Sequence, residues 1–206
     1  MLGWTLNSKD YLDRVCREIQ ALDLGQLDNL CEIIEDAYHA GRFVFIIGNG
    51  GSGANASHIS EDLAKATLRD FANQKRLKVL SLTDNTPAIL AWGNDEGFDR
   101  IFVEQLKNFA SPGDVLLAIS GSGNSPNILK AVEWANRAGL TTVGITGFGG
   151  GKLRTLARHN VHAGVDDMGI AESLHLTVFH WIIDDMYRRI SGPVATTAGA
   201  PATVGA

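Results

Sequence analysis

Five short apolar runs, separated by stretches with helical periodicity, constrain the fold of this chain more than any other feature. The runs predict strands at 43–47, 77–82, 115–119, 141–145 and 161–165. Helices are expected between and after them, at 52–68, 86–107, 126–138, 151–158 and 169–190. Strands that alternate with helices form βαβ units and a parallel sheet. Because the runs carry almost no polar residues, helices should cover both sheet faces. We therefore predict an α/β fold with a five-stranded, parallel, doubly wound sheet.

The segments that flank this pattern differ from it. Residues 8–39 predict two long helices, because apolar residues recur there at helical spacing. Ser8 is expected to cap the first helix, and Gly41 to end the pair. Residues 191–206 are rich in small residues and lack periodicity, which predicts a disordered tail. A chain of 206 residues is expected to form one domain, here 1–190.

Charge and hydropathy exclude several classes of partner. The chain carries 18 Lys and Arg against 23 Asp and Glu, a net charge of −5, and has no basic block that would bind nucleic acid. No apolar run approaches the roughly 18 residues of a membrane span, and the N-terminus does not resemble a signal peptide. We expect a cytoplasmic protein with neither a nucleic acid nor a membrane as partner. Cys16 and Cys31 are expected to be buried, reduced thiols.

Two loops of small residues each follow a predicted strand and precede a predicted helix. The first, 48–55, reads Gly-Asn-Gly-Gly-Ser-Gly-Ala-Asn, and the second, 120–126, reads Ser-Gly-Ser-Gly-Asn-Ser-Pro. Open α/β sheets bind ligands at the carboxyl ends of their strands. Glycine permits close approach of the backbone, and a helix N-terminus presents free N–H groups to an anion. The loops therefore predict a site for a small phosphorylated ligand.

Other interpretations of these loops are less favoured. Gly48, Gly50 and Gly53 match the G-x-G-x-x-G pattern of dinucleotide folds, which is weak by itself. The acidic residue that should bind ribose at the end of the second strand is absent, and Asp84 comes late. No Gly-Lys-Ser/Thr of a phosphate-binding P-loop is present. Tight turns without a ligand are plausible for one loop, but less so for two. We expect no nucleotide cofactor.

Histidines and carboxylates form a second constellation on two predicted helices. His58 and Asp62 are four residues apart and share a helix face, with Glu61 beside them. Glu172 and His180 lie eight residues apart, near one face of the last helix. These residues could hold a divalent metal such as zinc, or could form an acid/base pair. They could also be ordinary helix-end and core residues, and spacing alone leaves all three open.

These residues together resemble the SIS (sugar isomerase) family, and within it the phosphoheptose isomerases, over most of 8–190. The resemblance is carried by 48–52, His58 with 61–62, 93–95, 120–125, 146–147, and Glu172 with His180. It implies an aldose–ketose isomerase that converts sedoheptulose 7-phosphate to a heptose 7-phosphate through an enediol. It also implies a homotetramer with active sites between subunits, and the helical pair in 1–40 is expected to serve this oligomerisation.

The resemblance implies roles for individual residues as well. Phosphate is expected on Ser120, Gly121, Ser122 and Ser125. The other substrate-binding residues are expected to be Asn49, Gly50, Gly51, Ser52, Asn94, Asp95 and Glu172. Arg69 is expected either to reach the sugar or to lie on the solvated surface. The acid/base pair falls on Asp62 and His180, and the ligands of zinc-containing members fall on His58, Asp62, Glu172 and His180.

Three positions depart from the family pattern. Asp62 replaces a glutamate, Glu172 replaces a glutamine, and Gly169 stands where an aspartate is usual. Two neighbouring carboxylates repel each other, so that one stays protonated unless a cation is bound. The first two departures therefore favour a zinc or another divalent ion. A carboxylate that binds metal is a poorer base, which leaves the base as either Asp62 or Glu61.

Two other functions fit parts of the pattern. A non-catalytic SIS protein, acting as a phosphosugar-binding regulator or a protein-interaction factor, needs the phosphate loop but not the acid/base residues. The presence of His58, Asp62, Glu172 and His180 favours an enzyme over this alternative. An isomerase of another ketose phosphate is also compatible, because the phosphate loop contacts only the end that such substrates share.

Overall fold

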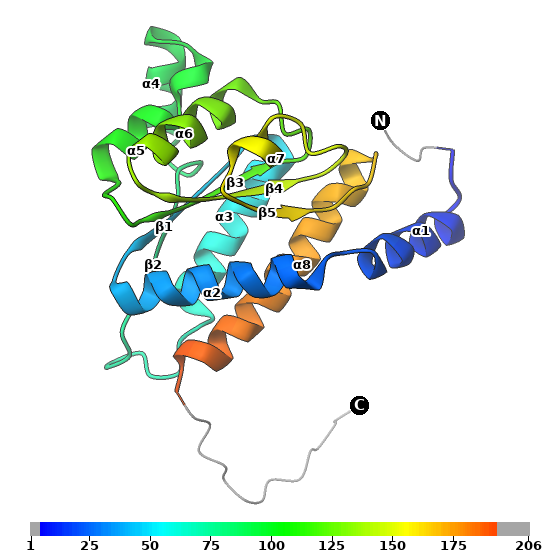
Figure 1. Ribbon diagram of the computed structural model, residues 1–206, viewed down its shortest axis with the longest axis horizontal. Coiled ribbons are helices and arrows are strands. Elements are labelled where there is room, and N and C mark those ends of the chain that lie inside the picture. Colours follow the sequence, from blue (N-terminus) through cyan, green and yellow to red (C-terminus); the bar gives the residue numbers. More distant parts are fainter. Residues whose placement is uncertain (1–4, 193–206) are drawn as a thin grey trace, which may run out of the picture.

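A parallel β-sheet forms the middle layer of the computed structural model, which describes residues 5–192 (Figure 1). Its strands are β1 (Phe43–Gly48), β2 (Lys78–Ser81), β3 (Val115–Ser120), β4 (Thr141–Thr146) and β5 (His159–His162). They lie in the order β2-β1-β3-β4-β5, and every neighbouring pair is parallel. The order reverses between β1 and β3, where doubly wound sheets place their ligands. The predicted fold class and strand number are confirmed.

Helices cover both faces of the sheet, as the apolar strand runs predict. The helices are α1 (Ser8–Gln20), α2 (Leu24–Ala40), α3 (Gly50–Lys65), α4 (Thr86–Asp95), α5 (Val103–Phe109), α6 (Pro126–Arg137), α7 (Leu153–Leu156) and α8 (Met168–Ile190), with a 3-10 turn η1 (Phe98–Arg100). Figure 1 shows α2, α3 and α8 on one side of the sheet and α5, α6 and α7 on the other.

The core is divided into two layers by the alternation of side chains along each strand. Val44 and Ile46 of β1 pack with α2, α3 and α8, whereas Phe45 and Ile47 pack with α5 and α6. In the centre of the sheet, all six residues of β3 are buried. The edge strands β2 and β5 are less buried, because each has a neighbour on one side only.

The ends of the N-terminal helices were predicted with partial success. Gly41 ends α2 in the left-handed conformation, with φ of 67°, which glycine adopts without steric cost. The cap of α1 is Asn7 and not Ser8, so that prediction is wrong. The side-chain oxygen of Asn7 accepts a hydrogen bond from the backbone N–H of Asp10 at 2.9 Å, and Ser8 is the first helical residue.

Two further expectations need correction. The single helix expected at 86–107 is divided into α4, η1 and α5, because the chain turns at Gly97, with φ of 104°. The last strand lies at His159–His162 and not at 161–165. Its pairing with β4 ends at His162, and Ala163 and Val165 pack near the start of α8 instead.

Cys31 is buried, as expected, whereas Cys16 is exposed, and both are free thiols. The exposure of Cys16 follows from the position of α1, which lies at the edge of the molecule (Figure 1). This helix has no buried residue and contacts the start of α8 only through partly buried side chains. None of the described helices combines the length and apolar content needed to cross a membrane. Most of the predicted disordered tail, 193–206, lies outside the described residues, so that prediction and the 1–190 domain boundary stay predictions.

Candidate active site

The two small-residue loops meet at the carboxyl end of the sheet. They follow the adjacent strands β1 and β3, whose register pairs Gly48 with Ile119. Between them lies a cavity of about 280 Å³. Nine of the expected substrate-binding residues line it: Asn49, Gly50, Gly51, Ser52, Ser120, Gly121, Ser122, Ser125 and Glu172. Ile119 and Met168 complete the lining, and sequence reasoning did not identify Met168.

Two of the helices that begin at this cavity, α3 and α6, lack side-chain caps. α3 begins after Asn49 and α6 after Ser125, and neither side chain caps the helix that follows it. The other long helices are capped by the side chains of Asn7, Asp23, Asn85 and Asp167. The open N-termini of α3 and α6 carry partial positive charge, which makes this end of the cavity suited to an anion.

A pair of side-chain amides fixes the two loops relative to each other. Asn49 donates to the side-chain oxygen of Asn127 at 2.9 Å, and Asn127 donates back to Asn49 at 2.8 Å. Asn127 is the second residue of α6 and is buried. Its side-chain oxygen also accepts a hydrogen bond from the backbone N–H of Ile128 at 3.0 Å. Both polar atoms of the Asn49 side chain are thus engaged with α6. The family resemblance implied Asn49 at the sugar but gave no indication of Asn127.

The loop 120–125 is shaped by hydrogen bonds that leave its hydroxyl protons available. The Ser120 hydroxyl oxygen accepts from the N–H of Gly123 at 3.2 Å and lies 3.5 Å from the Ser125 hydroxyl. The Ser122 hydroxyl oxygen accepts from the N–H of Asn124 at 3.3 Å. An accepting hydroxyl keeps its proton for donation. Ser122 can therefore donate to a phosphate oxygen without a basic side chain, and Ser120 and Ser125 can do the same where the phosphate replaces the hydrogen bond between them.

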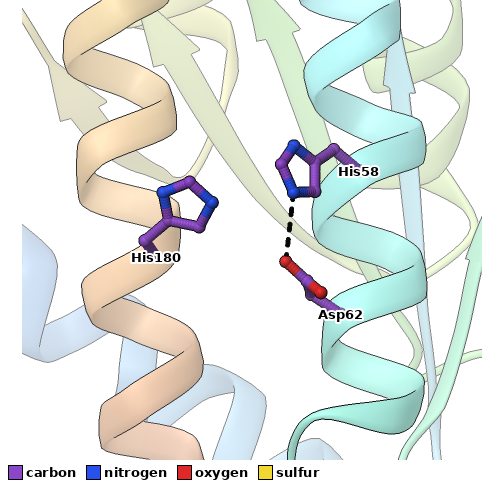
Figure 2. A group of neighbouring side chains, drawn as sticks. All are labelled: His58, Asp62 and His180. Atoms are coloured by element: carbon purple, nitrogen blue, oxygen red, sulfur yellow. Dashed lines mark ion pairs between the residues drawn. The ribbon is translucent and has the colours of Figure 1, made fainter. Parts of the chain in front are cut away.

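Three of the predicted metal or acid/base residues come together between α3 and α8. His58 and Asp62 project from α3 toward His180 on α8, as Figure 2 shows. The His58 Nε2 and the Asp62 Oδ2 are 3.2 Å apart, and the rings of His58 and His180 meet edge to face with centroids 5.1 Å apart. One potential ligand atom from each residue lies within 4.8 Å of the others. This donor set, two imidazoles and a carboxylate, fits a zinc ion.

Glu172 does not belong to this cluster within a single chain. It precedes His180 by eight residues, which is about 12 Å along the axis of α8 at 1.5 Å per residue. Its carboxylate lies instead beside Gly51, where a Cβ would come within 2.3 Å of Glu172 Oε1. Gly51 is thus needed for Glu172 to approach the start of α3. The place of Glu172 as a fourth metal ligand stays a prediction.

Four other predicted residues lie away from the cavity. Arg69 donates to the hydroxyl of Tyr187 at 3.3 Å, near the far end of α8. Asn94 and Asp95 are exposed at the end of α4, where the Asn94 amide donates to Asp95 at 2.8 Å. Glu61 is exposed on α3. Nothing in the described part of one chain brings these four residues to the phosphate loops.

Comparison with known proteins finds relatives that are similar in sequence and in fold. The sequence model of the SIS domain matches residues 9–147. A probable phosphoheptose isomerase of Thermoplasma acidophilum is 33% identical over 86% of this chain and 96% of its own length. A phosphoheptose isomerase of Campylobacter concisus is 37% identical over 80% of this chain and 87% of its own length. The solved phosphoheptose isomerase of Neisseria gonorrhoeae has a TM-score of 0.77 at 27% identity, over 84% of this chain and 91% of its own.

Proposed function

This chain belongs to the SIS-domain family, and we propose that it is an aldose–ketose isomerase of the phosphoheptose isomerase type. Its reaction converts sedoheptulose 7-phosphate to a heptose 7-phosphate through an enediol. The observation that carries this assignment is the presence, in one chain, of two features. One is a cavity of about 280 Å³ at the uncapped starts of α3 and α6, and the other is a His/Asp cluster on α3 and α8. A protein that only bound the phosphosugar would need the first feature alone.

The distance between these two features suits a substrate with its phosphate on the last carbon. His58 follows Gly50 by eight residues, or about 12 Å along α3. In sedoheptulose 7-phosphate the carbonyl is on C2 and the phosphate is on C7, so the reacting carbons lie at the opposite end from the phosphate. With phosphate on Ser120, Ser122 and Ser125, an open-chain sugar extends toward the cluster.

The proposed reaction transfers a proton between neighbouring carbons. A base removes the proton from C1, beside the C2 carbonyl, to give a cis-enediol, and an acid completes the transfer to C2. His180 and Asp62 are the candidates for these roles, because they face each other from two helices and are accessible to solvent. His58 contacts Asp62 and orients its carboxylate. Proton transfer of this kind contributes about 10²–10⁴-fold to an enzymatic rate.

We further propose that His58, Asp62 and His180 bind zinc. The predicted fourth ligand, Glu172, would join them only if its carboxylate left its place beside Gly51. When bound, the ion supplies Lewis-acid polarisation of the substrate carbonyl. Asp62 would then serve as a ligand, and the neighbouring Glu61 would take the part of the base. Within the described cluster, the ion pair given for the Asp62 carboxylate is the one with His58. A bound cation would add a second positive partner for this carboxylate.

The zinc proposal predicts that His58→Ala removes the metal without removing either member of the acid/base pair. The purified full chain should contain about one zinc per chain by elemental analysis, and the variant should contain much less, because one of three close ligands is lost. A chelator should inactivate the wild type. His39→Ala is the matched control, since His39 is an exposed histidine beside Glu35 on α2. Zinc-free wild-type protein whose activity resists chelation would contradict the proposal.

The chain is also proposed to form a homotetramer through its N-terminal helices. Support comes from α1 and α2, where Leu12 and Leu24 are 61% and 68% exposed, and from Trp181, which is 39% exposed beside His180 on α8. A second copy of the chain would cover these apolar side chains. A monomeric mass in solution by light scattering would refute this part of the proposal.

The activity itself is tested by incubation of the full chain with sedoheptulose 7-phosphate and detection of the aldose phosphate. Fructose 6-phosphate and unphosphorylated sedoheptulose are the comparison substrates, because the first tests the length of the sugar and the second tests the need for phosphate. Turnover of the heptulose phosphate alone supports the assignment. Binding without turnover of any of them would instead favour the non-catalytic regulator.

A further inference from the structure

A buried histidine that takes no part in the proposed chemistry joins α8 to the end of β4. His175 is 1% exposed, and its Nε2 lies 3.1 Å from the backbone oxygen of Thr146, the last residue of β4. The same oxygen already accepts the backbone N–H of Ala163 at 2.8 Å. The carbonyl of Thr146 is therefore satisfied without His175, so the histidine bond is not needed to remove an unpaired group.

The hydrogen-bonding partners define the state of the His175 ring. A carbonyl oxygen can only accept, so Nε2 carries the hydrogen. The other ring nitrogen, Nδ1, is buried and has no partner among the described residues. Protonation there would bury an unpaired charge, and burial lowers the pKa of His175 to about 4. His175 is thus a neutral, directional donor near neutral pH.

The orphaned Nδ1 makes a purely apolar role for His175 unfavourable. A buried acceptor without a partner is unfavourable, because it has given up its hydrogen bond to water and gained none in the protein. A leucine at this position would fill the core without that cost. Compared with an apolar residue, the histidine adds the hydrogen bond from Nε2–H to the backbone oxygen of Thr146. We therefore expect this bond to hold α8 in a fixed position relative to β4.

The bond connects the phosphate loop to the helix that carries His180. Directly after Thr146, the N–H of Gly147 donates to the backbone oxygen of Gly121 in the phosphate loop at 2.9 Å. At the same point α8 comes so close that a Cβ on Gly147 would lie 2.9 Å from the Cβ of Ala171. His175 follows Glu172 by three residues and precedes His180 by five. Its hydrogen bond to Thr146 therefore anchors α8 to the end of β4 at a point between Glu172 and His180.

We propose that His175 is a positioning residue, whose bond to Thr146 sets the distance between the phosphate loop and His180. This inference rests on the proposed isomerase function. A substrate held by its phosphate at one end reaches the acid/base residues only if α8 keeps its place relative to β4. Displacement of a catalytic group by about 1 Å can lower a rate about 10²-fold. Binding of phosphate depends on the loop itself and should be retained.

The test compares three variants of the full chain with sedoheptulose 7-phosphate as the substrate. His175→Leu removes the donor and should lower kcat about 10²-fold, with KM and competitive inhibition by inorganic phosphate changed little. His175→Gln keeps an N–H donor at nearly the reach of Nε2 and should restore most of kcat. Met186→Ala is the matched control, because Met186 is fully buried on the same face of α8 three turns later. It should lower the melting temperature but not kcat.

Each result decides between positioning and simple packing. Equal losses of kcat in His175→Leu and Met186→Ala, at matched melting temperatures, would overturn the inference, as would failure of His175→Gln to recover kcat. If His175→Leu does not fold, His175→Asn replaces it, since its amide reaches only the place of Nδ1. Asparagine that performs as well as glutamine would then overturn the inference. A wild type without turnover would refute the proposed function and this inference together, whereas an active wild type with an unaffected His175→Leu would refute the inference alone.

Discussion

His180→Ala should lower kcat for isomerisation by about 10²–10⁴-fold, the range expected for loss of a general acid or base. The imidazole of His180 lies opposite His58 and Asp62 and is the one member of the pair supplied by α8 (Figure 2). Because His180 is exposed, its truncation leaves no cavity in the core. Substitutions at such positions usually change stability by less than about 0.5 kcal/mol. The loss should therefore be one of chemistry and not of folding.

The measurement is a steady-state assay of kcat and KM together with a thermal melt. His39→Ala serves again as the control, because it removes an exposed histidine with a carboxylate neighbour on α2, outside the cluster of His58, Asp62 and His180. It should retain wild-type kcat. Full activity in His180→Ala would show that α8 does not supply the acid or base. A large drop in melting temperature would show instead that His180 supports the packing of α3 against α8.

Gly123→Ala should abolish measurable binding of phosphate and destabilise the chain by about 2 kcal/mol or more. Gly123 has φ of 65°, which an alanine adopts only with strain. Its Cβ would also lie 1.9 Å from the backbone oxygen of Gly150. Since the backbone fixes the position of the Cβ and the oxygen belongs to the backbone, no side-chain rotation can relieve the contact. The loop 120–125 must therefore move, and its three serine hydroxyls no longer point at one common phosphate position.

Gly149→Ala is the matched control for this variant. Gly149 lies in the loop that packs against Gly123, but a Cβ there would have no atom within 4 Å, and its φ is not positive. It should bind inorganic phosphate and melt as the wild type does. Titration calorimetry with phosphate and a thermal melt of both variants make the comparison. Wild-type affinity in Gly123→Ala would argue that the anion binds elsewhere than on this loop.

The sequence predicted more of the cavity than of the contacts that shape it. The serines of 120–125 and the glycines of 48–53 are informative because small residues directly after a buried strand have few other uses. Asn127 was missed, because an asparagine in the first turn of a helix resembles many helix starts. Its role depends on Asn49, which is far away in the sequence and close only once β1 and β3 pair. His175 was missed as a site residue for the same reason, since its partner Thr146 is 29 positions earlier.

Some errors have local physical causes. The helix expected at 86–107 breaks at Gly97, where the backbone turns. The prediction missed this break because the periodicity of apolar residues continues across the turn. Glu172 and His180 share a face of α8, which the 3.6-residue period predicts, but a common face does not bring them to a common point. The rise of about 12 Å between them places one beside Gly51 and the other beside His58.

The sequence by itself determined the alternation of strands and helices, and hence the parallel sheet, because hydrophobic periodicity and loop composition are local properties of the chain. It also predicted that loops of small residues follow β1 and β3, precede helices and form a site for an anion. Only the tertiary structure decided that α3 and α8 lie side by side, and so that His58, Asp62 and His180 share one cluster. The packing of those two helices depends on a core formed by residues from many elements, and no short stretch of sequence contains that information.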